Sequence, residues 1–470
     1  MKKSVVLAAI GLVSVQSILA EEENRQGDFN WSVGADLRVR QEIMDNIPGH
    51  PGNPGSAFPG ASGKNNNWFR FRPRAWVQAG DENFGIYFRL ADEVREHVAE
   101  NGKRRDERSY NFPDELIVDN LYFEFKTLWD DRLRLRIGRQ DFIDDGRFAF
   151  GSGRVLMDGT AYDGSRSAYF DALRATLKLG EKATLDGLAI YNLGENHLRW
   201  GRPTPHPRAI NAIDPRDSAD MDEYGGGLYF KSRQLGDDLP FELYYLAKRE
   251  THYRLLGVKK PGRLVHTWGA RFAPRFTETL TGEFEAAVQS GEKDSGATTS
   301  GLMGYAGLTY RPELDLPGGI SPYLRASCYY LSGDDGENGR DNRDTGWDPL
   351  WARWPQDSEM LVYGPLYGLG YWSNLIYPAL AIGADTKVRH RLKCYAGPMF
   401  CAEKDGYGGG DGAYQGFLAV ARYDFPLRTA GKNGRFDITG HMMGEVLQPG
   451  DYYTTDKTAY FFRWEIVVKF

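Results

Sequence analysis

The sequence predicts an all-β protein: a transmembrane antiparallel β-barrel of about 18 strands, with short periplasmic turns and long extracellular loops. Three observations predict it. The chain begins with a secretory signal, its strands alternate apolar and charged residues up to a terminal aromatic residue, and its connections alternate between long and short. A barrel also explains why aromatic residues make up 13% of a chain whose mean hydropathy is negative, because lipid-facing and water-facing residues alternate along each strand.

The N-terminus is expected to be a cleavable signal peptide. It starts with Met-Lys-Lys, continues with an apolar run over 5–19 and reaches Ala20 before three glutamates, a pattern typical of export signals. The apolar run is shorter than the roughly 20 residues that a helical membrane anchor needs, which disfavours the anchor as an alternative. We therefore expect a signal peptide over 1–20 and a single outer-membrane barrel domain over 21–470.

The last residues give the clearest strand. Aromatic and aliphatic side chains occupy alternate positions from 460 to Phe470, and Arg463, Glu465 and Lys469 occupy the opposite face. A terminal aromatic residue on such a strand is the signature that outer-membrane barrels present to their assembly machinery, which is therefore an expected partner. The alternative, an edge strand of a soluble sandwich, would need a second sheet to cover the aromatic face.

The same alternation marks earlier strands. Clean examples cover 31–40, 69–77 and 132–137, and each places arginines on one face and apolar residues on the other. Pro73 interrupts the second of these, and because proline removes a ladder hydrogen bond it predicts a bulge or the barrel rim. Less regular runs, rich in Tyr, Phe and Gly, cover 241–249, 280–289 and 301–310.

The connections between strands give an independent test of the fold. Seventeen connections imply about eighteen strands, an even number as outer-membrane barrels require. They alternate long and short almost throughout, with 290–299 and 311–320 the ambiguous pair. The connections are centred on 44–66, 80–83, 96–113, 127–131, 142–166, 179–182, 194–220, 233–239, 250–262, 273–277, 290–299, 311–320, 333–375, 385–387, 401–412, 427–433 and 448–457.

Charge and motifs exclude several function classes. The chain carries 58 Lys+Arg against 64 Asp+Glu, a net charge of −6 that becomes −8 without the two signal-peptide lysines, so nucleic acid is not an expected partner. Ser-nucleophile elbow, zinc-protease, Cys-x-x-Cys and phosphate-loop motifs are absent from the sequence, so we do not expect an enzyme. A hydrolase site on the barrel wall stays open as an alternative, because its partners would meet in space rather than in sequence.

No cofactor or metal site is expected. The polar, glycine-rich loops at 50–66, 333–348 and 405–412 contain aspartate clusters, which allow a structural calcium ion but lack EF-hand spacing. Cys394 and Cys401 would lie about 23 Å apart on one extended strand. We therefore expect no disulfide framework.

Arginines on the polar faces of predicted strands are the candidate functional residues. Inward-facing guanidinium groups concentrate anions and hydrogen-bond carboxylates. Alternatively they pair with inward acids, and both arrangements can coexist if unpaired arginines line a constriction. Such acids are Glu242, Glu283, Glu285, Asp437 and Glu465. The arginines are Arg38, Arg40, Arg70, Arg72, Arg74, Arg134, Arg136, Arg389, Arg391 and Arg463.

Short motifs cluster between residues 130 and 175, with two more near the end of the chain. They are LRIGRQ at 135–140, DDGR at 144–147, DGT at 158–160, DGSR at 163–166, FDALRA at 170–175, EKDG at 403–406 and EVLQPGDYY at 445–453. Together they resemble the alginate export family of outer-membrane proteins. The resemblance implies a barrel of about eighteen strands with an arginine-rich constriction that passes an anionic polysaccharide.

The resemblance also implies roles for three arginines. Arg136 and Arg139 are expected to line the lumen or its constriction, and Arg174 is a further candidate. Because Arg139 is off the parity of Arg136, this assignment requires a bulge at Gly138.

These features lead us to expect a passive channel in the bacterial outer membrane that favours anionic solutes, such as alginate or its oligosaccharides. The expected partners are outer-membrane lipid, the anionic poly- or oligosaccharide and the barrel assembly machinery. The alternatives are a general or sugar-specific porin with a charge-paired lumen, a barrel-wall hydrolase, and a structural barrel with a plugged lumen.

Overall fold

The computed structural model describes residues 29–48, 66–98, 116–144, 146–159, 167–193, 198–200, 222–255, 258–334, 342–352, 358–360, 373–404, 409–429 and 436–470. The predicted signal peptide, the motif at 163–166 and parts of the candidate calcium loops, including 335–341 and 405–408, lie outside these ranges. Those predictions therefore stay predictions.

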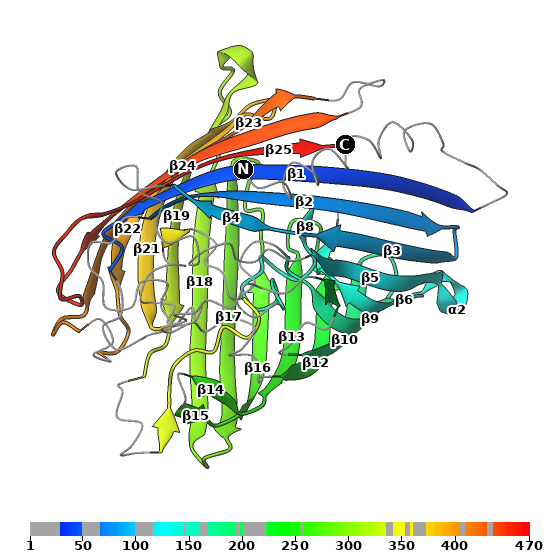
Figure 1. Cartoon of the computed structure of the whole chain (residues 1–470), viewed down its shortest axis with the longest axis horizontal. Coiled ribbons are helices and arrows are strands. Elements are labelled where there is room, and N and C mark those ends of the chain that lie inside the picture. The colour runs from blue at the N-terminus through cyan, green and yellow to red at the C-terminus, as the bar shows by residue number, and fades with distance from the viewer. Residues whose placement is uncertain are drawn as a thin grey trace.

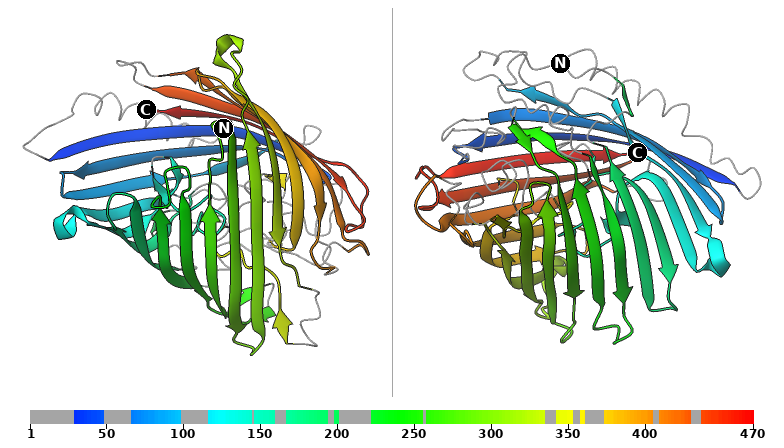
Figure 2. Two further views of the ribbon diagram at one scale, coloured as in Figure 1. Left: turned by 180° about the vertical axis from the view of Figure 1, so that it is seen from behind. Right: turned by 90° about the horizontal axis from the view of Figure 1, so that it is seen from below.

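Eighteen antiparallel strands of the described chain close one barrel, if β3 and β4 are counted as a single interrupted strand (Figures 1 and 2). The strands are β1 (Asn30–Asp45), β2 (Asn66–Gly80), β3 (Phe84–Ala91) with β4 (Val94–His97), β5 (Leu116–Thr127), β6 (Leu133–Gln140), β9 (Phe170–Lys178), β10 (Ala183–Asn192), β12 (Glu223–Ser232), β13 (Phe241–Glu250), β16 (Arg263–Phe272), β17 (Leu280–Lys293), β18 (Thr298–Tyr310), β19 (Ser321–Leu331), β21 (Leu375–Asp385), β22 (Arg391–Phe400), β23 (Tyr414–Arg428), β24 (Asp437–Pro449) and β25 (Ala459–Lys469).

Short elements occupy the connections. They are α2 (Leu128–Asp131), η1 (Pro317–Gly319), β7 (Ile143–Asp144), β8 (Arg147–Phe148), β11 (Arg199–Trp200), β14 (Tyr253–Leu255), β15 (Val258–Lys260) and β20 (Arg343–Asp344). None of the helices in the described ranges is long and apolar enough to cross a bilayer.

The barrel closes through its terminal strands. β25 pairs antiparallel with β1 over ten residue pairs, and the Phe470 N–H donates to the Ala35 carbonyl at 2.8 Å. In Figure 1, β1 and β2 cross in front of β17 and β18, as opposite walls of a barrel with tilted strands do. Closure gives the backbone groups of the edge strands partners, so the sheet does not depend on another chain to cover its edges.

Side chains sort by parity as the sequence predicts. Large apolar side chains point out of the barrel and stay exposed, among them Phe123, Trp268 and Leu380, which is 72% exposed. Arg38 and Arg40 lie on the opposite face of β1 and are buried. An exposed apolar outer face with buried charges inside is the pattern of a barrel that stands in lipid.

The alternation of loop lengths is confirmed except at two consecutive connections: 294–297 is short for the long-loop end, and 311–320 is long for the short-turn end. Eight connections on the short-turn end run from 81–83 to 429–436, and they alternate with connections on the other end of the barrel. The connection expected at 290–299 is only 294–297, because β17 and β18 extend their pairing to Glu292 and Thr298. This hairpin is short although it lies on the long-loop end.

The two predicted bulges are not formed. β2 pairs with β3 up to Arg74 and with β4 from Phe71, in one unbroken register, so Pro73 marks an interruption of the ladder rather than a bulge. Pro73 accepts a hydrogen bond from the Asp92 N–H at 3.1 Å. At Gly138 the register with β5 also continues without a shift. Glycine is needed there because a Cβ would lie 2.3 Å from the Leu121 carbonyl oxygen.

Two long connections fold back into the barrel and carry its apolar core. Phe142 and Phe150 come from the connection between β6 and β9, and Trp351 comes from the one between β19 and β21. The two segments meet, since Leu156 and Trp351 form a parallel bridge and the Trp351 carbonyl accepts from the Asp158 N–H at 2.9 Å. Packing against inward side chains such as Tyr229 (5.0 Å from the Phe150 ring) places them inside the lumen.

Candidate functional site

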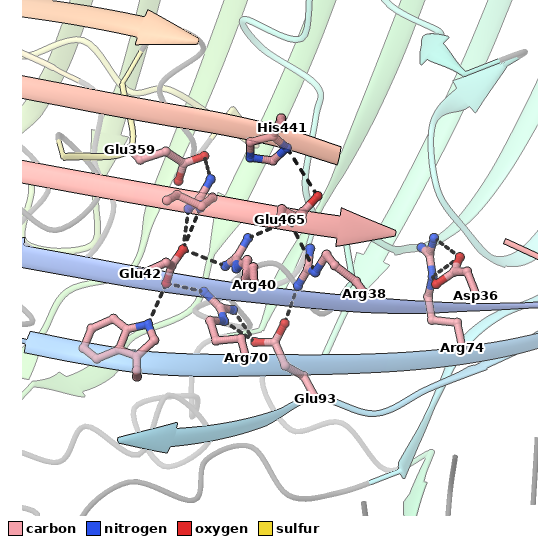
Figure 3. Close-up of polar contacts among 12 residues, drawn as sticks. Asp36, Arg38, Arg40, Glu42, Arg70, Arg74, Glu93, Glu359, His441 and Glu465 are labelled. Atoms are coloured by element: carbon pink, nitrogen blue, oxygen red, sulfur yellow. Dashed lines mark hydrogen bonds and ion pairs between the residues drawn. The ribbon is translucent and has the colours of Figure 1, made fainter. Parts of the chain in front are cut away.

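The strands that close the barrel carry a cluster of charges on their inner face, which we call the basic wall (Figure 3). The register of β1 and β2 places Arg38 directly opposite Arg72 and Arg40 directly opposite Arg70. Like charges at directly opposed positions destabilise a sheet unless acids separate them. The basic wall consists of Arg38, Arg40, Arg70, Arg72, Arg74 and Arg463, with the carboxylates Asp36, Glu42, Glu93, Glu359 and Glu465.

Glu93 neutralises the first part of this cluster. It lies in the interruption between β3 and β4, where the strand does not have to hold a regular ladder position. Its carboxylate accepts from Arg38 Nη2 at 2.5 Å and from the Arg70 guanidinium. Glu465 of β25 lies 3.7 Å from Arg38 and 3.8 Å from Arg40 on the other side. The opposed arginines are therefore held between acids from both neighbouring strands.

Glu42 connects the basic wall to the last strand. Its carboxylate lies 3.1 Å from Arg40 and 3.5 Å from Arg70, and it accepts from Arg463 and from the Trp68 indole at 2.6 Å. The Glu42 side chain is fully buried. Burial without such partners would be very costly for a carboxylate. A single buried acid thus contacts three arginines.

Glu359 joins the basic wall from an infolded connection. Arg463 Nη1 donates to its carboxylate at 2.5 Å, in addition to the bond with Glu42. Burial raises the pKa of Glu359, but the charge of Arg463 and its hydrogen bond outweigh burial and bring that pKa down to about 2. The adjacent Ser358 and Met360 donate to Glu445 of β24 at 2.5 and 3.1 Å. This segment is therefore attached to β25 by an ion pair and to β24 by hydrogen bonds.

A second arginine group lies on β6 and β9. Arg134 and Arg136 each donate from Nε to the same Glu124 oxygen, at 2.8 and 2.9 Å. Arg174 donates to Asp186 at 2.9 Å and to Asp144 of β7. Arg134 is the most open of the three, with its side chain 49% exposed. This group contributes further inward positive charge, shared with carboxylates from the wall and from a loop.

The opposite wall carries carboxylates, tyrosines and arginines. β16 lies nine strands from β1 in either direction around the barrel, and its neighbours carry Glu242, Glu283 and Glu285 on their inner faces. Tyr229 donates to Glu242 at 2.5 Å and Tyr244 donates to Glu285 at 3.0 Å. Arg271 of β16 donates to Glu242 at 2.6 Å, and Arg325 of β19 lies 3.4 Å from Glu283. The lumen is thus lined by arginine-rich strands on one side and by paired carboxylates and arginines with tyrosines on the other.

An arginine from the first infolded connection pairs with the carboxylates of this wall. Arg154 Nη1 donates to Glu283 at 2.8 Å and to Glu285 at 2.9 Å, and its guanidinium lies 3.6 Å from the centre of the Tyr305 ring. Such a cation–π contact adds to the ion pairs when the group is desolvated. Arg154 therefore fastens the connection across the lumen from its origin on β6.

Most of the predicted arginines come together in these two groups, and three do not. Arg139 shares the outward face of Ile137 and Leu173, pairs with Asp171 at 2.7 Å and stacks on Tyr169 at 3.8 Å. The bulge that would place Arg139 on the face of Arg136 is not formed, so strand parity does not support the prediction that it lines the lumen. Arg389 is not on a strand but lies exposed in the 386–390 turn, at φ 68°, because β22 begins only at Arg391. Arg391 is exposed at the first position of β22.

Sequence reasoning named Glu465 but missed the other acids of the basic wall and the loop residues that complete the site. Glu42 shares the parity of Arg38 and Arg40, so strand alternation could have identified it. Glu93 sits beyond a clean strand, and Arg154 and Glu359 belong to connections without periodicity. Only a structure brings these last three into the lumen.

Metal binding has no support within the described ranges, where no three His, Cys, Asp or Glu side chains converge on one point. The aspartate-rich stretches at 335–341 and 405–408 lie outside those ranges, so the calcium site stays a prediction. Cys328, Cys394 and Cys401 are free thiols.

Comparison with known proteins identifies the fold. No family model matches the chain. No curated protein matches it in sequence. Solved outer-membrane porins match it in structure: OccAB1 of Acinetobacter baumannii (TM-score 0.51, 11% identity, covering 96% of this chain and 99% of that one), OccAB2 of the same organism (0.51, 9%, 93% and 98%) and OccK8 (OprE) of Pseudomonas aeruginosa (0.50, 11%, 94% and 98%). At such low identity the likeness establishes a porin-like barrel over nearly the whole chain.

Proposed function

We propose that this protein is a passive outer-membrane channel that favours anionic solutes, with acidic polysaccharides such as alginate, or their oligosaccharides, as its cargo. The observation that carries the proposal is the basic wall, where two pairs of arginines stand directly opposite each other on the inner face. As defined above, the basic wall has six arginines and five carboxylates. The porin-like fold supports diffusion through the barrel rather than catalysis on it.

The chemistry of the basic wall suits a carboxylate-bearing solute. A carboxylate entering a narrow lumen loses part of its hydration, and guanidinium groups replace it with paired N–H donors. Arg134, with half of its side chain exposed, and the opposed arginines of β1 and β2 offer successive donors to a moving chain of carboxylates. Multiple weak sites allow release as well as entry.

The resemblance to the alginate export family supports this cargo. Within the LRIGRQ motif, Arg136 faces the lumen and donates to Glu124, while Arg139 faces outward. The family assignment and alginate itself are part of the proposal. They rest on short motifs, of which the one at 135–140 contributes a single lumen arginine.

The extent of charge pairing favours a second candidate, a general or sugar-specific porin. Carboxylates lie within 4 Å of Arg38, Arg40, Arg70, Arg74 and Arg463 in the basic wall. Neutralised arginines would give a polar lumen with weak ion preference. The two candidates differ in a measurable way, because only the first makes the channel anion-selective.

Planar-bilayer recordings of the purified full-length protein distinguish the candidates. Under a salt gradient, we expect a reversal potential on the anion-selective side, and we expect oligouronates to block the current more strongly than neutral oligosaccharides of equal length. Open channels without ion preference, blocked equally by both sugars, would favour the general porin. An absence of channels would contradict transport altogether.

A further inference from the structure

One wall arginine is already occupied by a carboxylate that the chain itself supplies. Asp144, in the hairpin of β7 and β8, reaches from the infolded connection to Arg174 of β9. Arg174 Nη1 lies 3.1 Å from Asp144 Oδ1 and Nη2 lies 2.8 Å from Oδ2. This is the two-pronged arrangement in which a guanidinium holds a carboxylate.

The surroundings of this contact are strongly cationic. Arg136 lies 3.8 Å from Asp144, and the nearby charge of Lys231 acts on the same carboxylate. Burial raises the pKa of Asp144, but the hydrogen bond and charge of Arg174, followed by Arg136, bring that pKa below its ordinary value. These cationic surroundings therefore favour the ionised form of Asp144.

Arg174 keeps its wall partner without Asp144. Its Nε donates to Asp186 of β10, so only the two terminal nitrogens serve the loop carboxylate. Asp144 remains 38% exposed, whereas Arg174 is only 8% exposed beneath it and beneath Phe150, whose ring centre lies 4.9 Å away. The carboxylate can thus be reached from solvent, and its departure would uncover two donors in a fixed orientation.

The hairpin does not depend on Asp144 to stay in the lumen. Arg154 on the same connection is ion-paired to Glu283 and Glu285, Ser152 donates to Glu283, and Lys231 donates to the Ala149 carbonyl at 2.9 Å. A side chain that is not essential for holding its loop is free to exchange with a ligand.

We propose that Arg174 and Arg136 form a carboxylate-binding subsite of the channel, and that Asp144 is its resident occupant, displaced by the carboxylate of a passing sugar acid. The proposal rests on the proposed anion-selective function and names the step at which a uronate is recognised. A sugar carboxylate matches the planar, two-oxygen group that the two donors of Arg174 already hold. Displacement makes apparent affinity lower than intrinsic affinity, which lets the solute leave again.

Asp144→Asn tests the subsite by removing the competing charge. The concentration of glucuronate that halves the single-channel current should fall about tenfold, if Asp144 occupies the subsite in about nine of ten molecules. Asp144→Ala serves as a second variant and should behave alike. Block by sulfate and by neutral glucose should change much less.

Ser152→Ala is the matched control. It removes a different anchor of the same connection, so it loosens the loop without exposing Arg174. Equal gains in Ser152→Ala and Asp144→Asn would overturn the subsite, as would a gain for sulfate as large as that for glucuronate. If the wild-type channel is anion-selective and blocked by glucuronate, but Asp144→Asn leaves the glucuronate block unchanged, the subsite alone would be overturned. A wild-type channel with neither property would instead overturn the proposed function.

Discussion

At the scale of single residues, the basic wall depends on buried acids that contact more than one arginine each. Glu42 is the clearest case, because it is fully buried and contacts Arg40, Arg70 and Arg463. Removing one partner of a buried ion pair costs more than the pair itself contributes, since the remaining charges are left desolvated. Substitutions of the acids should therefore affect stability and selectivity in opposite directions.

Glu42→Gln should make the channel less stable and more anion-selective. We expect unfolding to become easier by about 3–5 kcal/mol, as for other broken buried pairs, while the anion-to-cation permeability ratio rises. Urea unfolding in detergent micelles and reversal potentials measure the two effects. Asp294→Asn is the control, because it breaks the half-exposed outer pair with Arg249 (2.6 Å) and should change stability by at most about 1 kcal/mol. A less anion-selective Glu42→Gln channel would contradict this account of the basic wall.

Glu359 predicts an acid-sensitive contribution to stability. Its pKa is lowered from 4.5 to about 2 in the folded chain, so its contribution is fully present above pH 4.5 and is lost as the pH falls towards 2. Urea midpoints of the wild type and of Glu359→Gln, measured across this range, should differ by a constant amount above pH 4.5 and converge near pH 2. Midpoints that keep the same separation at pH 2 would show that the Arg463 contact is not the cause.

At the scale of elements, the sequence predicted strands better than connections. Alternation identified which side of β1, β2, β6 and β25 faces inward, because a period of two follows directly from strand geometry. The bulge at Gly138, which the family resemblance required if Arg139 is to share the face of Arg136, is not formed, because the register with β5 is continuous. Alternation gave no sign that the connections after β6 and β19 fold inward, since their contacts with the wall are made by residues without periodicity.

The infolded connection after β6 should be released by removing Arg154. Arg154→Gln breaks two ion pairs and the contact with Tyr305, and it leaves Glu285 buried without its cation. We expect a stability loss of about 3 kcal/mol and a larger single-channel conductance, because the connection no longer crosses the lumen. Single-channel recordings measure the conductance. Arg249→Gln, which removes an outer charge, should leave the conductance unchanged. Equal conductance in both variants would contradict the attachment of this connection through Arg154.

At the scale of the whole molecule, closure of the barrel creates the candidate site. Arg463 and Glu465 come from the last strand and the opposed arginines from the first two, so the basic wall exists only when β25 pairs with β1. The sequence predicted this neighbourhood, the strand number and the alternation of loops. It did not predict that a second wall of paired carboxylates, arginines and tyrosines lies nine strands from the basic wall, because that follows from strand order around the ring.

The ion selectivity of an inward and an outward arginine variant tests the central claim most directly. Arg40 faces the lumen, whereas Arg139 is equally buried but lies on the outward face. A unit charge about 10 Å from an ion in water contributes about 0.4 kcal/mol, or about twofold in permeability. The account predicts an anion-selective wild type, an anion-to-cation ratio about twofold lower in Arg40→Gln, and no change in Arg139→Gln, with both variants checked for folding by heat-modifiable migration on gels. A ratio that is unaffected by Arg40→Gln, or lowered equally by both substitutions, would contradict it.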